Sequence, residues 1–145
     1  MALSAIGSAE IAYEVGKGGA IEGRAIGIHL TYSPVVDIQT QPGNPVLSVR
    51  SFGGDLDLLG RMAGAYVRGY QENGMLATAK HYPGRGDVEL IPGTEFTINR
   101  KPAEQVERED LLAFKKAIDA DVAFIMSEHI AVLERAALVT KRRRG

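Results

Sequence analysis

The chain has 145 residues, a length that suits one domain with a buried core. Its 45% hydrophobic and 24% charged residues are typical of an ordinary globular protein, and 17 basic against 18 acidic residues leave a net charge of -1. From this balance we expect no nucleic-acid partner and no membrane partner. The absence of cysteine excludes disulfides, a thiol nucleophile and thiolate metal sites.

The first part of the chain predicts a helix followed by a strand. Ser8 is a suitable N-cap for the helix. The apolar residues that we expect on its buried face are Ile11, Val15 and Ile21. The range 26–38 predicts a strand and its exit, with Asp37 at that exit.

A second helix precedes the strand that carries the main motif. We predict that this helix begins at Asp55 and runs to about Gln71. Its expected buried stripe comprises Leu58, Leu59, Met62, Ala65, Tyr66 and Tyr70. The apolar run 75–79 then predicts a buried strand, and Lys80 and His81 follow at its carboxyl end.

A third helix and a third strand complete the pattern after a long loop. The helix starts near Pro102. Its apolar positions are Val106, Leu111, Leu112, Phe114 and Ile118. The run 122–126 predicts another buried strand, which exits into Glu128 and His129. Three alternations of helix and strand predict an α/β fold with a parallel sheet, whose strand ends would bring Asp37, the 80–81 pair and the 128–129 pair to one face.

The candidate site is the stretch Ala77-Thr78-Ala79-Lys80-His81-Tyr82-Pro83-Gly84-Arg85-Gly86. A lysine and a histidine at a strand end can hold neighbouring hydroxyls of one polar substrate. The glycines can let backbone approach the ligand closely. The alternative is a surface strand end with two solvated side chains.

Five blocks of the sequence resemble glycoside hydrolase family 3, in its N-terminal TIM-barrel domain. The blocks are Pro34-Val35-Val36-Asp37, Asn44-Pro45, Arg50-Ser51-Phe52-Gly53, the stretch 77–86, and Phe124-Ile125-Met126-Ser127-Glu128-His129. The similarity runs from about Ser4 to Val132. It is strongest to the bacterial β-N-acetylhexosaminidase branch.

The resemblance implies a (β/α)8 TIM-type barrel and a retaining glycosidase that acts through a covalent glycosyl-enzyme intermediate on a carbohydrate substrate. It implies no cofactor. By motif match, the sugar-binding arginine of the family corresponds to Arg50, and its lysine–histidine pair corresponds to Lys80 and His81. For Arg50 the alternative is a salt bridge with Asp37 or Asp55.

Two catalytic features of the family have no counterpart here. The aspartate–histidine dyad of the hexosaminidase branch falls at Ile91-Pro92-Gly93, which leaves the acid/base open. The carboxylic acids on the same loop, Asp87, Glu89 and Glu95, are the candidates for that role. The nucleophilic aspartate of the family belongs to a later strand and is absent from this chain. Arg85 also replaces the second histidine of the motif.

A complete barrel needs roughly 250 residues, whereas this pattern supplies about three of the eight βα units. We therefore expect residues 1–132 to be a fragment of the family's N-terminal domain, followed by a basic tail, 133–145, that is disordered or outside the family pattern. Such a fragment would be catalytically inactive alone. Its unpaired sheet edges would favour self-association.

Two other functions stay open at this point. A non-catalytic carbohydrate-binding or scaffold protein would keep the sugar contacts without the catalytic groups. A nucleotide-binding domain using Gly84-Arg85-Gly86 is disfavoured, because the glycines lack the dinucleotide spacing. We expect no metal site, since the three histidines come from separate elements. The sequence shows no signal peptide, which predicts a cytoplasmic protein if its start is genuine.

Overall fold

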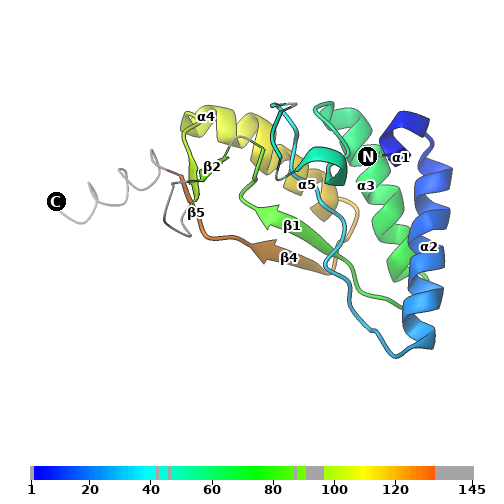
Figure 1. Cartoon of the computed structure of the whole chain (residues 1–145). Helices are drawn as coiled ribbons and strands as arrows, with labels where there is room; N and C mark the ends of the chain where they lie inside the picture. Colours follow the sequence, from blue (N-terminus) through cyan, green and yellow to red (C-terminus); the bar gives the residue numbers. More distant parts are fainter. Residues whose placement is uncertain (1, 42, 46, 87, 91–96, 133–145) are drawn as a thin grey trace.

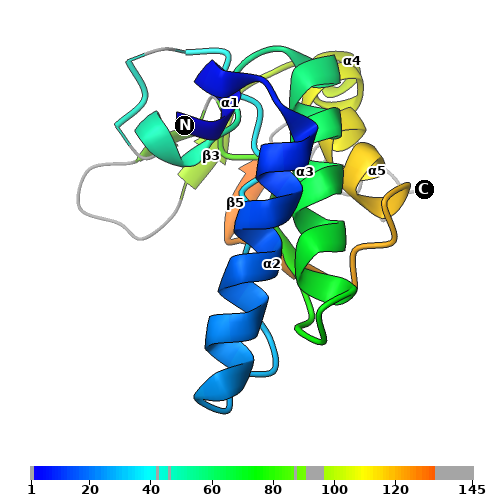
Figure 2. The ribbon, with the colours of Figure 1, turned by 90° about the vertical axis from the view of Figure 1, so that its right-hand side faces the viewer.

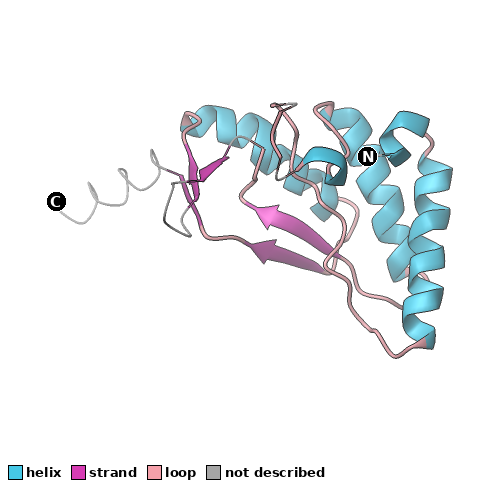
Figure 3. Cartoon of the chain, in the orientation of Figure 1, coloured by secondary structure: helices cyan, strands magenta, loops and turns pink. Residues whose placement is uncertain are grey.

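The computed structural model describes residues 2–132 except 42, 46, 87 and 91–96 (Figure 1). Its helices are α1 (Ala2–Ile6), α2 (Ala9–Ala25), α3 (Leu56–Gln71), α4 (Ala103–Val106) and α5 (Leu112–Ile118). Its strands are β1 (Thr78–Tyr82), β2 (Val88–Leu90), β3 (Thr97–Asn99), β4 (Phe124–Ser127) and β5 (Ile130–Val132) (Figure 3). A 3-10 turn, η1, covers Ser48–Arg50, and a π-helical turn, η2, covers Glu107–Leu111.

A parallel sheet lies at the centre of the fold. β1 pairs in parallel with β4, with Thr78 opposite Phe124. On the other side of β1 runs the extended segment 29–36, joined through parallel bridges from Leu30 to Leu76 and from Val35 to Lys80. α3 connects this segment to β1, and α4, η2 and α5 connect β1 to β4. The predicted α/β order is therefore confirmed, although 29–36 is held by single bridges rather than by a continuous ladder.

Helices cover the sheet, and α2 lies along α3 (Figure 2). The two helices approach backbone to backbone at their glycines. A Cβ atom added at Gly16 would lie 2.5 Å from the carbonyl oxygen of Tyr66, and one added at Gly69 would lie 2.2 Å from the carbonyl oxygen of Tyr13. Only residues without a side chain fit this contact.

The main core joins α2, α3 and α5 to β1 and to the segment 36–38. Its buried residues are Ala12, Val36, Ile38, Phe52, Leu59, Met62, Ala63, Ala65, Ala79, Ala113, Phe114 and Ala117. The predicted start of α3 at Asp55 is confirmed, because the Asp55 side chain accepts hydrogen bonds from the N–H groups of Asp57 and Leu58. This core fixes the sheet against the helices and thereby fixes the strand ends.

The predicted buried face of α2 was wrong. Ser8 caps the helix as expected, yet Ile11, Val15 and Ile21 are 43%, 45% and 55% exposed. The buried residues are Ala12, Gly16, Ala20 and Gly23. The close contact with α3 requires small residues, so packing distance rather than hydrophobicity decides which face is inward.

Three further predictions need correction. Phe124 and Ile125, expected in a buried strand, are 47% and 42% exposed, because within the described residues β4 has a paired neighbour on one side alone. β1 begins later than expected, so Lys80 and His81 lie within the strand rather than after it. On the third helix, Val106 and Phe114 are buried, but Leu112 and Ile118 are exposed.

The long loop before α4 contributes two strands to a second small sheet that was not predicted, and β5 supplies the third. β2 pairs antiparallel with β3, and β3 pairs in parallel with β5. The basic tail at 133–145 lies outside the described residues. None of the described helices combines the length and the apolar character needed to cross a bilayer.

Candidate sugar-binding site at the strand ends

The carboxylate of Asp37 is the centre of the candidate site. The residue is 1% exposed, and its Oδ2 lies 2.8 Å from Nδ1 of His81. The backbone N–H of His81 lies 3.2 Å from both carboxylate oxygens, and the N–H of Arg85 donates to Oδ1 at 2.8 Å. The hydroxyl of Ser51 donates to the Asp37 carbonyl at 2.7 Å. The ends of the first two parallel segments therefore meet, as predicted.

The end of β4 joins the same cluster through Arg85. Nη2 of Arg85 lies 2.8 Å from Oε1 of Glu128, and both side chains are largely buried. The N–H of Glu128 donates to the carbonyl of Tyr82 at 2.9 Å. His129, the other predicted exit residue, has an exposed side chain, and its carbonyl accepts a hydrogen bond from Thr97. All three segments thus contribute to one cluster, in which Arg85, at the motif position where the resemblance expects a second histidine, forms an ion pair.

The charges of this cluster influence the pKa of Lys80. Burial lowers the pKa of its ammonium below the usual value, and the nearby cations Arg50 and Arg85 lower it further. The carboxylates of Asp37 and Glu128 act in the opposite direction. Asp37 therefore acts on both residues of the pair, because its carboxylate contacts His81 and influences the pKa of Lys80.

Arg50 ends η1 and is exposed. The alternative interpretation paired it with Asp37 or Asp55. In the described part of the chain, however, the Asp37 carboxylate is bonded to His81 and Arg85, and the Asp55 carboxylate caps α3. Arg50 acts electrostatically on Lys80. The grouping of Arg50 with Lys80 and His81 as a sugar-binding set stays a prediction.

The two motif glycines accommodate atoms of the protein itself. Gly84 has φ of 130°, and a Cβ atom there would lie 2.7 Å from Cβ of Asp110. A Cβ atom at Gly86 would lie 2.1 Å from the carbonyl oxygen of Ile38. Nδ2 of Asn44 donates to the carbonyls of Arg85 and Gly86 at 3.1 and 3.0 Å. The loop is thereby held with the Arg85 N–H aimed at Asp37.

A buried ion pair behind Gly84 was not predicted. Nζ of Lys101 lies 3.2 Å from the Asp110 carboxylate and 2.9 Å from Glu109. Asn99 also donates to Asp110. Helical spacing offered a signal, because Asp110 falls four residues after Val106 and four before Phe114, on the stripe that faces inward. An acidic residue on that stripe needs a buried partner.

The candidates for the acid/base lie mostly outside the described residues. Asp87, Glu95 and the Ile91-Pro92-Gly93 stretch are among the residues that the structure does not describe. Glu89 belongs to β2, where its backbone is opposite Ile98. The assignment of the acid/base therefore stays a prediction. The described residues contain no group of three or more histidine or acidic side chains that could hold a metal ion.

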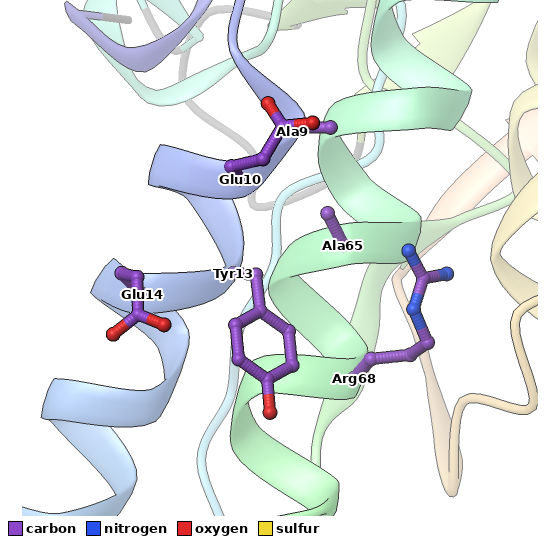
Figure 4. A pocket seen from close by; sticks show the side chains of 6 residues that line it. All are labelled: Ala9, Glu10, Tyr13, Glu14, Ala65 and Arg68. Atoms are coloured by element: carbon purple, nitrogen blue, oxygen red, sulfur yellow. The ribbon is translucent and has the colours of Figure 1, made fainter.

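A hollow of about 320 Å³ lies elsewhere, between α2 and α3 (Figure 4). It is lined by Ala9, Glu10, Tyr13, Glu14, Ala65 and Arg68. The hydroxyl of Tyr13 donates to Glu72 at 2.8 Å. None of the lining residues belongs to the strand-end cluster, so the candidate site rests on the chemistry of that cluster.

Comparison with known proteins places this geometry in a family. Residues 1–136 match the Glycosyl hydrolase family 3 N terminal domain. The chain is 36% identical over 121 residues to a beta-hexosaminidase of Xylella fastidiosa (strain M12), covering 83% of this chain and 36% of that protein. It is 34% identical over 130 residues to a beta-N-acetylglucosaminidase/beta-glucosidase of Cellulomonas fimi, covering 90% of this chain and 23% of that protein.

Solved structures give the same result. The glycoside hydrolase family 3 beta-N-acetylglucosaminidase from Paenibacillus sp. str. FPU-7 matches with a TM-score of 0.85 and 39% identity, over 91% of this chain and 25% of that chain. NagZ from Neisseria gonorrhoeae, in complex with N-trifluoroacetyl-D-glucosamine, matches with a TM-score of 0.77 and 32% identity, over 89% and 36%.

Parallel strands joined by helices, with polar strand ends on one face, define part of a TIM-type barrel. The chain belongs to glycoside hydrolase family 3, within its N-terminal domain, which confirms the resemblance drawn from the five sequence blocks. It spans 36% and 23% of the lengths of the two curated relatives named above.

Proposed function

We propose that this chain supplies part of the sugar-binding subsite of a retaining glycosidase. The substrates are β-linked N-acetylhexosaminides or related β-glycosides, and the role is in carbohydrate metabolism. The observation that carries the proposal is the convergence of Asp37, His81 and Lys80 at the carboxyl end of a parallel strand, in a chain of this family. The names of the similar proteins, beta-hexosaminidase and beta-N-acetylglucosaminidase, support the substrate class.

In this proposal Arg50, Lys80 and His81 bind hydroxyl groups of the sugar. Arginine offers a planar set of donors, lysine a compact cationic donor, and histidine either a donor or an acceptor. Hydrogen bonds of this kind strengthen as the sugar approaches the oxocarbenium-like transition state, so they contribute to rate as well as to binding.

The catalytic carboxylate that attacks the sugar lies outside these 145 residues in our proposal, and the acid/base comes from Asp87, Glu89, Glu95 or another part of the parent protein. The isolated chain therefore binds sugar without hydrolysing glycosides. Turnover of an aryl N-acetyl-β-glucosaminide by the pure chain, abolished by Lys80→Ala, would contradict this.

Binding of N-acetylglucosamine, measured by calorimetry, tests the subsite. We expect Lys80→Ala to weaken binding about tenfold or more, because a hydrogen bond from a charged donor is lost. Lys115→Ala is the matched control, since Lys115 pairs with Asp119 on the exposed side of α5. Equal affinity of the two variants would overturn the assignment of Lys80.

A non-catalytic carbohydrate-binding or scaffold protein is the second candidate. The observation in its favour is Ile91-Pro92-Gly93, which stands where the hexosaminidase branch carries its catalytic dyad. The two functions give the same binding result but differ in the full-length parent protein. Hydrolysis by the parent supports the glycosidase, and binding without hydrolysis supports the alternative.

We also propose that the isolated chain self-associates through its sheet edge. Among the described residues no strand pairs with the outer edge of β4, and its Phe124 and Ile125 side chains are exposed. Light scattering after gel filtration should show Ile125→Lys shifted toward monomer. Ile21→Lys, which alters an exposed apolar residue on α2, should leave the assembly unchanged. A monomeric unmodified chain would refute the proposal.

A further inference from the structure

The contact between Asp37 and His81 determines where the histidine carries its proton. Three nitrogen atoms surround the Asp37 carboxylate: the backbone nitrogens of His81 and Arg85, and Nδ1 of the His81 ring. Backbone N–H groups can only donate, and an ionised carboxylate can only accept. Backbone N–H groups already donate to both oxygens of this carboxylate, so it is placed to accept from the ring nitrogen as well. The 2.8 Å contact is therefore a hydrogen bond donated by Nδ1–H of His81.

A neutral imidazole has one proton, so in the neutral form of His81 Nε2 is left as a bare acceptor. Within the described part of the chain, Nδ1 is the ring nitrogen that makes a hydrogen bond, and Nε2 bonds to none of those residues. The side chain of His81 is 8% exposed to solvent. Its neighbour Lys80 carries a donor alone, because an ammonium group has no acceptor. The two adjacent side chains therefore offer opposite hydrogen-bonding functions.

We propose that Asp37 is a positioning residue that fixes His81 in the Nδ1–H tautomer, so that Nε2 accepts a hydrogen bond from a sugar hydroxyl while Lys80 donates to a sugar oxygen. The inference rests on the proposed sugar-binding function of the site. It adds a requirement on the ligand, which must present a hydroxyl proton to His81. An oxygen or fluorine that can only accept satisfies Lys80 but leaves Nε2 without a partner.

The tautomer is measurable without any ligand. In the 145-residue chain labelled with 15N, long-range 1H–15N correlation spectra distinguish a protonated from a bare ring nitrogen. We expect Nδ1 protonated and Nε2 bare in His81. A proton on Nε2 in the unmodified chain would overturn the inference.

Asp37→Asn tests the positioning role, because the amide must still accept the backbone N–H groups with its oxygen and so presents its NH2 group to Nδ1. We expect the proton of His81 to move to Nε2 and the affinity for N-acetylglucosamine to fall about tenfold. Asp57→Asn is the matched control, since Asp57 is exposed and pairs with Lys116. An unchanged His81 tautomer in Asp37→Asn would refute the role of Asp37.

The unmodified chain provides a second test if Asp37→Asn does not fold. Saturating N-acetylglucosamine should shift the 15N signal of His81 Nε2, and at least one deoxyfluoro analogue should bind about tenfold more weakly than the parent sugar. Sugar binding that leaves the Nε2 signal unchanged would overturn the proposed contact. If the tautomer is as expected but no sugar binds, the role of Asp37 is supported and the proposed function is what fails.

Discussion

Gly16 and Gly18 lie two residues apart on α2, but their surroundings differ. A Cβ atom at Gly16 would lie 2.5 Å from the carbonyl oxygen of Tyr66 and 3.3 Å from Cα of Gly69. A Cβ atom at Gly18 would have nothing within 4 Å. Alanine at these two positions therefore makes the same chemical change in the same helix, with and without a neighbouring backbone.

The expected effects on the free energy of unfolding have opposite signs. In a helix interior, alanine is about 1 kcal/mol more favourable than glycine, so Gly18→Ala should stabilise the chain by up to that amount. Gly16→Ala gains the same helix-propensity energy, but its Cβ atom forces α2 away from α3. Overpacking of a well-packed contact costs about 1–3 kcal/mol. Because the atoms in the way are backbone atoms, we expect the upper part of that range and a net loss of about 1–2 kcal/mol.

Urea unfolding followed by far-ultraviolet circular dichroism measures both variants. The midpoint should rise for Gly18→Ala and fall for Gly16→Ala, with unchanged slopes of unfolding free energy against urea. Equal stabilisation by both substitutions would refute the close approach of the two helices. Equal destabilisation would refute the argument from helix propensity.

Three further predictions concern the site and its charges. Alanine at Gly86 would place its Cβ atom 2.1 Å from a backbone carbonyl oxygen, so calorimetry should show loss of N-acetylglucosamine binding, whereas Gly43→Ala, with nothing within 4 Å, should retain it. Hydrogen bonds from backbone N–H groups of α3 lower the pKa of Asp55 from 3.8, so its stabilising contribution is complete above that value and is lost as the pH falls below it. The melting temperature of the unmodified chain should then fall more steeply below about pH 4 than that of Asp55→Asn, and parallel curves would refute this role. Burial, together with Arg50, lowers the pKa of Lys80. The folded chain therefore releases this proton more readily than the unfolded chain does. As a result, the free energy of unfolding rises with pH in the range just below 10.5. The 13C signal of dimethylated Lys80 should titrate below 10.5, and a titration at or above that value would contradict the burial argument.

The convergence of the strand ends was predictable because it follows from topology. In a parallel sheet with helical crossovers, the carboxyl ends of successive strands lie at one edge. Polar residues at three strand exits therefore had to meet, and Asp37, His81 and Glu128 do belong to one cluster. The identity of the pairs was not predictable. Whether Asp37 would bind His81 or Arg50 depends on distances of a few ångströms between loops. The order of the strands does not determine these distances.

The inward face of α2 was not predictable from hydrophobicity, because the contact with α3 selects for size. Ala12, Gly16, Ala20 and Gly23 recur at intervals of three or four residues, which is the spacing of one helix face. In the sequence, a second pattern formed by Ile11, Val15 and Ile21 also indicates a buried face, on the other side of the helix. When two helices approach closely enough to exclude side chains, the small residues decide the orientation and the larger apolar residues remain exposed.

The glycines of the motif make room for other parts of the protein. Their presence in the sequence predicted close approach of backbone to something, and a sugar was the natural candidate. In the structure Gly84 makes room for Asp110 and Gly86 makes room for the carbonyl of Ile38. Between them, the N–H of Arg85 is directed at Asp37, whose carboxylate in turn holds His81. In the proposed site, the glycines therefore act on the sugar through Asp37 and His81. The sequence motif alone does not say which atoms lie beside each glycine, and those atoms decide its role.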